Sequence, residues 1–199
     1  MKIKFILFFA FFTYFYSLQA QENKLSFAAL ELTKNKVTYD PSYFSIPYPK
    51  GDVPKGKGVC TDVIIRAYRK LGIDLQQEVH EDMKANFSLY PKIWGLKRTD
   101  TNIDHRRVPN LMTFFKRKGT VKKITLNPNN YLPGDIVCWS LEGGLTHIGI
   151  VSSKKSPTNN KRYLIVHNIG LGQVLEDCLF NFKIIGHYRY MTNIGIMTK

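Results

Sequence analysis

The sequence predicts an α+β fold, with helices in the first part of the chain and an antiparallel sheet in the second. Apolar residues recur at helical spacing as far as Lys118, whereas from Val121 onward they alternate as strand residues do. Short spacers between the strand-like runs favour an antiparallel meander. About 180 residues follow the N-terminal leader-like segment, which suits one domain with a substantial core.

The chain begins with a segment typical of exported proteins. Lys2 and Lys4 precede an uncharged, mostly apolar run, and Ala20 offers a small residue for cleavage. We therefore expect a signal peptide at residues 1–20, export across the inner membrane to the periplasm, and no stable membrane insertion afterwards. A retained anchor is the alternative, but the apolar run is shorter than the roughly 20 residues that a spanning helix needs.

The expected elements follow in order. Residues 21–38 are an N-terminal helical segment, and residues 39–191 are one domain, followed by a tail at 192–199. The stretch 38–58 is rich in proline and glycine and predicts an ordered loop. Helical spacing and capping residues predict helices at 25–35, 59–71, 75–86 and 108–118. Alternation predicts strands at 135–141, 147–152, 163–168 and 183–191.

The net charge of the chain indicates which classes of partner it is expected to bind. Beyond residue 20 there are 27 basic and 15 acidic residues, a net charge of +12. Outside the cytoplasm such a surface favours anionic wall polymers, lipid headgroups or acidic peptides. The basic residues are spread along the chain without a nucleic-acid-binding motif, so we expect no nucleic-acid partner. No cysteines or histidines have metal-type spacing, so we expect no metal and no cofactor. We also expect a monomer.

Cys60 is the first candidate for chemistry. It follows a loop rich in glycine and lysine and opens a predicted helix. Free N–H groups at a helix start favour a thiolate and help to hold an oxyanion. Asp62 in the same turn opposes a second negative charge. A buried structural cysteine is the alternative.

His147 and His167 form the second candidate group. Each lies ten residues from Pro157, near the tip of the intervening loop, so a symmetric hairpin would place the two histidines opposite each other on one face. One ring would then hold the other in the right tautomer. A slip of one residue would bring Asn168 there instead. A solvent-facing His147, or two histidines that merely stack in a polar patch, remain alternatives.

Arg106 and Arg107 are candidates for binding a substrate carboxylate, since guanidinium groups bind carboxylates in a bidentate manner. An internal salt bridge with Asp100, Asp104 or Asp135 is an equally good interpretation.

The other two cysteines look structural. Cys138 lies in an apolar run, and Cys178 lies beside Leu179 and Phe180. Both suit the core, and a disulfide between them is the alternative that an oxidising compartment permits. With three cysteines in total, at least one thiol is free. His187 suits packing against the sheet.

These features together resemble a known pattern. In the order of its motifs, the chain is similar to the NlpC-type papain-like cysteine peptidases, which are largely bacterial cell-wall hydrolases. The motifs are a cysteine that opens a helix, followed by LPGDIV, THIGIV and VHNIG. More closely, residues 39–190 resemble the uncharacterised domain-of-unknown-function family 1287, through GVCTDVIIRAYRKLGIDLQ, NIDHRRVPNL and GHYRY. The resemblance implies a papain-like core with Cys60 as nucleophile, His147 as base and His167 as the orienting residue.

Two departures put the substrate in doubt more than the fold. The peptidases have Asp-Cys-Ser-Gly at the nucleophile, where this chain has Val-Cys-Thr-Asp at 59–62, and the insertion at 72–132 is longer than theirs. The leading hypothesis is amide hydrolysis in peptidoglycan stem peptides, with Arg106, Arg107 and Asn168 as substrate-binding candidates. A non-catalytic wall-binding module and a thiol acyltransferase are the alternatives. An enzyme is expected to have a Cys60 that iodoacetamide alkylates faster than a free thiol near neutral pH.

Overall fold

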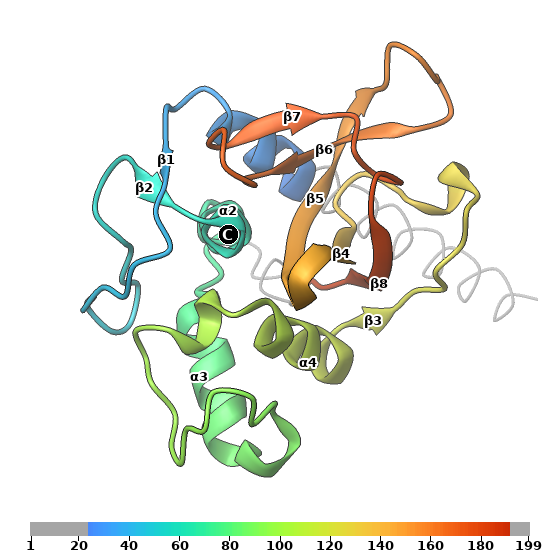
Figure 1. The fold of residues 1–199 in the computed structure, drawn as a ribbon. Coiled ribbons are helices and arrows are strands. Elements are labelled where there is room, and N and C mark those ends of the chain that lie inside the picture. The colour runs from blue at the N-terminus through green and yellow to red at the C-terminus, as the bar shows by residue number, and fades with distance from the viewer. Residues whose placement is uncertain (1–23, 192–199) are drawn as a thin grey trace, which may run out of the picture.

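A computed structural model describes residues 24–191, in which helices pack on a six-stranded antiparallel sheet (Figure 1). This confirms the α+β class. The signal peptide expected at residues 1–20 and the tail at 192–199 lie outside the described residues. Among residues 24–191, no helix is both long and apolar enough to cross a membrane.

The helices lie where the apolar periodicity predicts them. Residues 24–32 are helical. The other three helices are α2 (Cys60–Arg69), α3 (Leu75–Ala85) and α4 (Val108–Lys118). Asp74 caps α3 by accepting a hydrogen bond from the backbone N–H of Gln76, at 3.2 Å. Single turns of 3₁₀ helix occur at Phe87–Leu89, Asp104–Arg106, Pro128–Asn130 and Glu142–Gly144.

The strands of the main sheet follow the order β3-β8-β4-β5-β6-β7, and all pairs are antiparallel. Strands β4, β5 and β6 form a meander as predicted. β7, which the sequence did not predict, extends it, and β8, the last predicted strand, pairs instead with the other side of β4. Two short strands, β1 (Thr38–Tyr39) and β2 (Lys57–Gly58), pair in parallel beside α2 (Figure 1). The main strands are β3 (Thr120–Val121), β4 (Ile136–Ser140), β5 (Thr146–Lys155), β6 (Tyr163–His167), β7 (Val174–Glu176) and β8 (Lys183–Arg189).

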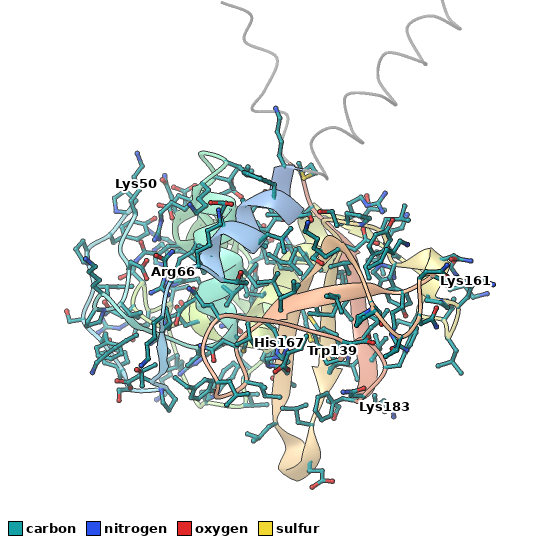
Figure 2. The ribbon with its side chains drawn as sticks, turned by 90° about the horizontal axis from the view of Figure 1, so that it is seen from above. Lys50, Arg66, Trp139, Lys161, His167 and Lys183 are labelled. Atoms are coloured by element: carbon teal, nitrogen blue, oxygen red, sulfur yellow. The ribbon has the colours of Figure 1, made fainter. Side chains whose placement is uncertain are left out.

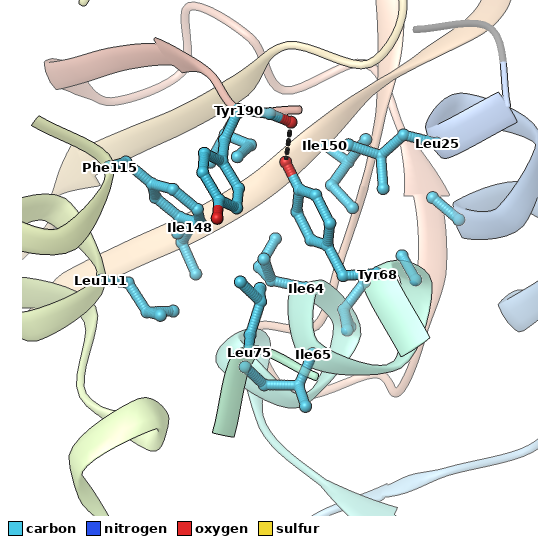
Figure 3. Close-up of a cluster of buried hydrophobic side chains, with 14 of the residues drawn as sticks. Leu25, Ile64, Ile65, Tyr68, Leu75, Leu111, Phe115, Ile148, Ile150 and Tyr190 are labelled. Carbon is cyan, nitrogen blue, oxygen red and sulfur yellow. Dashed lines mark hydrogen bonds between the residues drawn. The ribbon is translucent and has the colours of Figure 1, made fainter. Parts of the chain in front are cut away.

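One face of the sheet packs against the helices. Alternation turns Cys138, Ile148 and Ile150 toward this face, where they share a core with α2, α4 and the helix at 24–32 (Figure 3). Full burial of an aliphatic side chain such as Ile148 contributes about 1.5–3 kcal/mol. Because Leu25 belongs to the same cluster, the expected segment 21–38 and the domain that follows it share one core.

The opposite face carries a second, smaller core. Trp139, Val151 and Ile165 point there, and segments after β7 cover them. The indole N–H of Trp139 donates to the carbonyl oxygen of Leu179 at 2.9 Å, so the one polar atom of this buried ring has a partner. The sheet therefore separates the α2 side from the side on which the histidines of β5 and β6 lie.

Candidate active site

Cys60 is the first residue of α2 and lines a cavity of about 470 Å³. Its exposed fraction is 7%, and Trp94, Arg107 and Thr146 line the same cavity. A volume of this size is in the range of small-molecule sites. The thiol is thus nearly buried, yet it belongs to the wall of a cavity.

Two contacts tie the start of α2 to the rest of the molecule. The Asn168 side-chain amide donates to the carbonyl oxygen of Gly58 at 3.1 Å, and the Thr61 hydroxyl donates to the carbonyl oxygen of Arg106 at 3.2 Å. Gly58 has a φ of 157°, and a Cβ there would lie 3.0 Å from a guanidinium nitrogen of Arg66. Asn168 therefore positions the loop that leads into Cys60.

Asp62, whose negative charge disfavours a thiolate at Cys60, forms an ion pair with an arginine. Its carboxylate accepts from the backbone N–H of Val59 at 2.7 Å and pairs with the Arg106 guanidinium at 3.0 Å. The side chains of Arg106 and Asp62 are 1% and 4% exposed. Arg106 also donates to the carbonyl oxygen of Ser42 at 3.0 Å. Arg106 therefore forms an internal salt bridge, as one interpretation of the sequence had it, but its partner is Asp62 and not Asp100, Asp104 or Asp135. Its guanidinium hydrogen-bonds within the protein.

Three backbone N–H groups point at the sulfur of Cys60. They belong to Ile148, Thr61 and Cys60 itself, and each lowers the pKa of the thiol. Burial outweighs them and, with a smaller contribution from Asp62, raises the pKa of Cys60 to about 12. The resting group is therefore a neutral thiol with thiolate-stabilising donors already in place.

The Ile148 N–H is free to bind the sulfur because β6 stops short of it. β5 and β6 pair with Ile150 opposite Val166, and the same register would place Asn168 opposite Ile148. β6 ends one residue before Asn168, whose side chain turns to Gly58 instead. The backbone N–H of Ile148, the residue after His147, is thus available to the Cys60 thiol and lowers its pKa.

His147 points to the other face of the sheet from Ile148, as strand alternation requires. Trp139 and His167, both labelled in Figure 2, have ring centroids 5.7 and 5.0 Å from that of His147. Burial, and to a smaller degree the His167 ring, lowers the pKa of His147 to about 3, so its imidazole is neutral at pH 7. Among residues 24–191, no hydrogen bond joins the Cys60 sulfur to the His147 ring.

The two histidines are in direct contact. Nε2 of His147 lies 2.9 Å from Nδ1 of His167. They are not directly opposite, because the observed register is shifted by two residues from the symmetric hairpin and β5 has a bulge between Val151 and Lys155. A shift of two residues preserves the face, since side chains alternate with a period of two. This is why both rings still meet.

Glu176 in β7 completes a hydrogen-bonded row of three side chains, His147, His167 and Glu176. Its carboxylate lies 3.0 Å from Nε2 of His167. A carboxylate only accepts hydrogen bonds, so Nε2 of His167 donates and its Nδ1 accepts from Nε2–H of His147. Nδ1 of His147 then carries the free lone pair of a base. Burial lowers the pKa of His167, and Glu176 offsets part of that shift.

Cys178 lies at the far end of the same row, with its sulfur 3.4 Å from Nε2 of His167. Cys178, His167 and His147 thus form a buried arrangement that suggests a catalytic triad. The suggested disulfide does not form: all three cysteines are free, and Cys138 lies in the core on the α2 side whereas Cys178 lies in the core on the other side. Burial raises the pKa of Cys178 to about 12.

Arg107 lies over the Trp94 ring, with its guanidinium carbon 4.1 Å from the ring centroid. Its Nη1 is buried and has no hydrogen-bond partner among the described residues. Burial lowers the pKa of Arg107, and the nearby Asp104 offsets part of the shift. Both arginines suggested by the sequence line the cavity, and Arg107 is the one without an ion pair to Asp62.

The remaining sequence candidates lie elsewhere. His187 stacks on Tyr131, with ring centroids 4.3 Å apart, and Asp135 bonds to it at 2.8 Å. Sequence reasoning missed Glu176 and the Trp94–Arg107 stack. The strand that carries Glu176 is only three residues long, so the sequence offered no alternation that could have predicted it.

Sequence comparisons agree with the resemblance to domain-of-unknown-function family 1287. The chain is 53% identical over 152 residues to the uncharacterised protein YijF of Escherichia coli (strain K12), covering 76% of this chain and 73% of YijF. It resembles the solved structure of NlpC1 from Trichomonas vaginalis with a TM-score of 0.45 and 16% identity, over 85% of this chain and 45% of that chain, so it spans less than half of NlpC1. The family model described as Domain of unknown function (DUF1287) matches residues 26–190. The chain therefore belongs to the DUF1287 family.

Proposed function

We propose that this protein is an exported, papain-like cysteine hydrolase that cleaves an amide bond, with Cys60 as nucleophile, His147 as base and His167 as the residue that orients the base. The observation that carries the proposal is that Cys60 opens α2 in the wall of a cavity and interacts with the backbone N–H of Ile148, the residue after His147. The hydrogen-bonded row from Glu176 to His147 supports it further.

The reaction uses the free lone pair on Nδ1 of His147. This nitrogen takes the proton of the Cys60 thiol as the sulfur attacks the substrate carbonyl, and a carbon–sulfur bond forms. The imidazolium then gives the proton to the leaving amine as the carbon–nitrogen bond breaks. His147 then takes a proton from water as its oxygen attacks the thioester. The carbon–sulfur bond breaks, the acid is released, and the imidazolium returns its proton to the Cys60 thiolate. The backbone N–H of Cys60 helps to hold the oxyanion.

Proton transfer in this scheme waits for substrate. With the pKa of Cys60 raised to about 12 by burial, the free protein holds little thiolate at pH 7. The rapid alkylation near neutral pH expected from the sequence is therefore replaced by slow alkylation that rises with pH. Catalytic hydrogen bonds often tighten only in the substrate complex, which accounts for a resting thiol without a bond to its base.

Cys60 is a better nucleophile than Cys178 for two physical reasons. Cys60 lines the 470 Å³ cavity, whereas the residues lining that cavity do not include Cys178. Cys60 also opens a helix of ten residues, so helix N–H groups favour its thiolate, while Cys178 has Glu176 and Asp177 beside it, which raise its pKa.

Peptidoglycan stem peptides are the substrate class that we propose. They carry free carboxylates and amide bonds and lie in the compartment to which a signal peptide would deliver the protein. Arg107 lines the cavity and is our candidate for binding one such carboxylate.

The test is to incubate the purified mature protein with muropeptides and to detect new amines by mass spectrometry. We expect cleavage by the wild-type protein and by Cys178→Ala, and none by Cys60→Ala. Cleavage by Cys60→Ala would exclude the nucleophile. Tight muropeptide binding without cleavage would favour a wall-binding module, and acyl transfer to an added amine in place of hydrolysis would favour an acyltransferase; either result would overturn the hydrolase proposal.

A further inference from the structure

Three side chains converge on the face of the sheet that carries His147 and His167, and one of them, Cys178, has no part in the proposed reaction. Nε2 of His167, a carboxylate oxygen of Glu176 and the sulfur of Cys178 all lie within 4.8 Å of one another. Nε2 is 3.0 Å from Glu176 and 3.4 Å from Cys178. β6 and β7 supply the first two, and the chain directly after β7 returns the third.

We propose that His167, Glu176 and Cys178 form a binding site for a transition-metal ion, Zn²⁺ above all. An imidazole, a thiolate and a carboxylate are the ligand types that Zn²⁺ takes. Tetrahedral Zn²⁺ with its usual bond lengths sets neighbouring ligand atoms about 3.3–3.6 Å apart, and the distances of 3.0 and 3.4 Å from Nε2 of His167 to Glu176 and Cys178 are close to this range. Three protein ligands leave a fourth position for water or another ligand.

The surroundings also suit a metal ion. The side chain of His167 is 1% exposed, but that of Glu176 is 37% exposed and gives an entry path from solvent. Nδ1 of His167 already faces Nε2 of His147, which is the hydrogen-bonded outer partner that a metal-binding histidine has. Arg162 and Ser156 hold the intervening Asp177, so this carboxylate does not compete for the ion.

A metal ion at this site would reverse the tautomers of the row, an inference that rests on the proposed function. The ion takes the lone pair of Nε2 of His167, so the His167 proton must sit on Nδ1 and be donated to Nε2 of His147. His147 then carries its own proton on Nδ1. That nitrogen can no longer accept the thiol proton of Cys60, and the hydrolase is switched off.

The protons balance. His167 loses a proton from Nε2 and gains one on Nδ1 from His147, while His147 gains one on Nδ1 from solvent. The two imidazoles therefore keep their total number of protons. The Cys178 thiol releases one proton to solvent as it becomes a thiolate ligand, and with the Glu176 carboxylate it balances the charge of the dication.

Direct binding tests the site without reference to activity. We expect purified mature protein to bind one Co²⁺ with a sulfur-to-metal charge-transfer absorption that Zn²⁺ displaces. Cys178→Ala should abolish that absorption, Glu176→Gln should weaken binding at least about tenfold, and Cys60→Ala should leave it unchanged. No binding by the wild-type protein, or an unchanged absorption in Cys178→Ala, would overturn the proposal.

Nitrogen NMR of the histidine rings tests the switch separately. We expect protonated Nε2 of His147 in metal-free protein and protonated Nδ1 after Zn²⁺ is added, with no change in Glu176→Gln at the same metal concentration. In an active preparation, Zn²⁺ should reduce amide cleavage and a chelator should restore it. If the metal-bound protein kept its His147 tautomer, the switch would be contradicted but the binding site would stand. If the protein bound metal but had no hydrolase activity, only the proposed function would be contradicted.

Discussion

Nε2 of His147 lies 2.9 Å from Nδ1 of His167, and this contact decides which nitrogen of His147 is free to act as a base. Glu176 sets the direction of the row by accepting from the other nitrogen of His167. The base, its orienting residue and the carboxylate come from three successive strands, β5, β6 and β7. Their arrangement follows from strand register, without any local sequence motif around Glu176.

His167→Ala should lower kcat with little effect on KM, because the loss affects the tautomer of the base and not substrate contacts. A fall in kcat of roughly 10²-fold or more is expected for loss of an orienting residue. His167→Asn, which keeps an acceptor near His147, should recover part of the rate. Steady-state kinetics on a cleavable peptide checks this; a rise in KM with kcat intact would assign His167 to substrate binding.

Asp62→Asn should destabilise the protein strongly. The Asn side chain still accepts from Val59, but Arg106 is left buried and unpaired, which costs about 3–5 kcal/mol. Glu31→Gln is the control, since its pair with Lys34 is solvent-exposed and its loss should cost no more than about 1 kcal/mol. Urea unfolding of the three proteins measures the difference, and equal losses would contradict the buried pair.

Arg107→Ala should raise KM for a substrate with a free carboxylate near the scissile bond and leave kcat nearly constant. Arg107 lines the cavity, whereas the exposed Arg98 is not among the residues that line it. Arg98→Ala is therefore the matched control for loss of one positive charge. If both variants raise KM equally, a general charge effect and not a specific contact explains the binding.

Stability should fall as the pH is lowered from about 6.5 toward 3. Burial lowers the pKa of both His105 and His147 to about 3, from an ordinary value of 6.5. Below pH 6.5 the unfolded chain binds protons at these rings that the folded protein does not, so each ring removes about 1.4 kcal/mol per pH unit in this window.

The measurement is urea unfolding at several pH values between 7 and 4. His105→Gln should reduce the slope of stability against pH, whatever it does to stability at pH 7. Because His105 lies outside the histidine row, the same comparison with His147→Gln shows whether the second ring is also buried and neutral. A slope that neither substitution changes would mean that both histidines are protonated in the folded protein.

The helices and the meander could be predicted because their signals are local. Apolar spacing together with Pro109 and Gly119 gave α4 its observed bounds, Val108–Lys118. The pairing of Asp62 with Arg106 had no such signal, since 44 residues separate them. β7 was missed because three residues are too short for alternation to distinguish a strand from a turn, and Glu176 was missed with it.

Peptide mapping of a trapped acyl-enzyme tests the central claim most directly. The protein is mixed with an activated thioester of a stem peptide, quenched in acid within the first turnover, digested and analysed by mass spectrometry. The account predicts an acyl group on Cys60, in wild-type protein and in Cys178→Ala alike. An acyl group on Cys178, or unmodified Cys60 during active turnover, would contradict it.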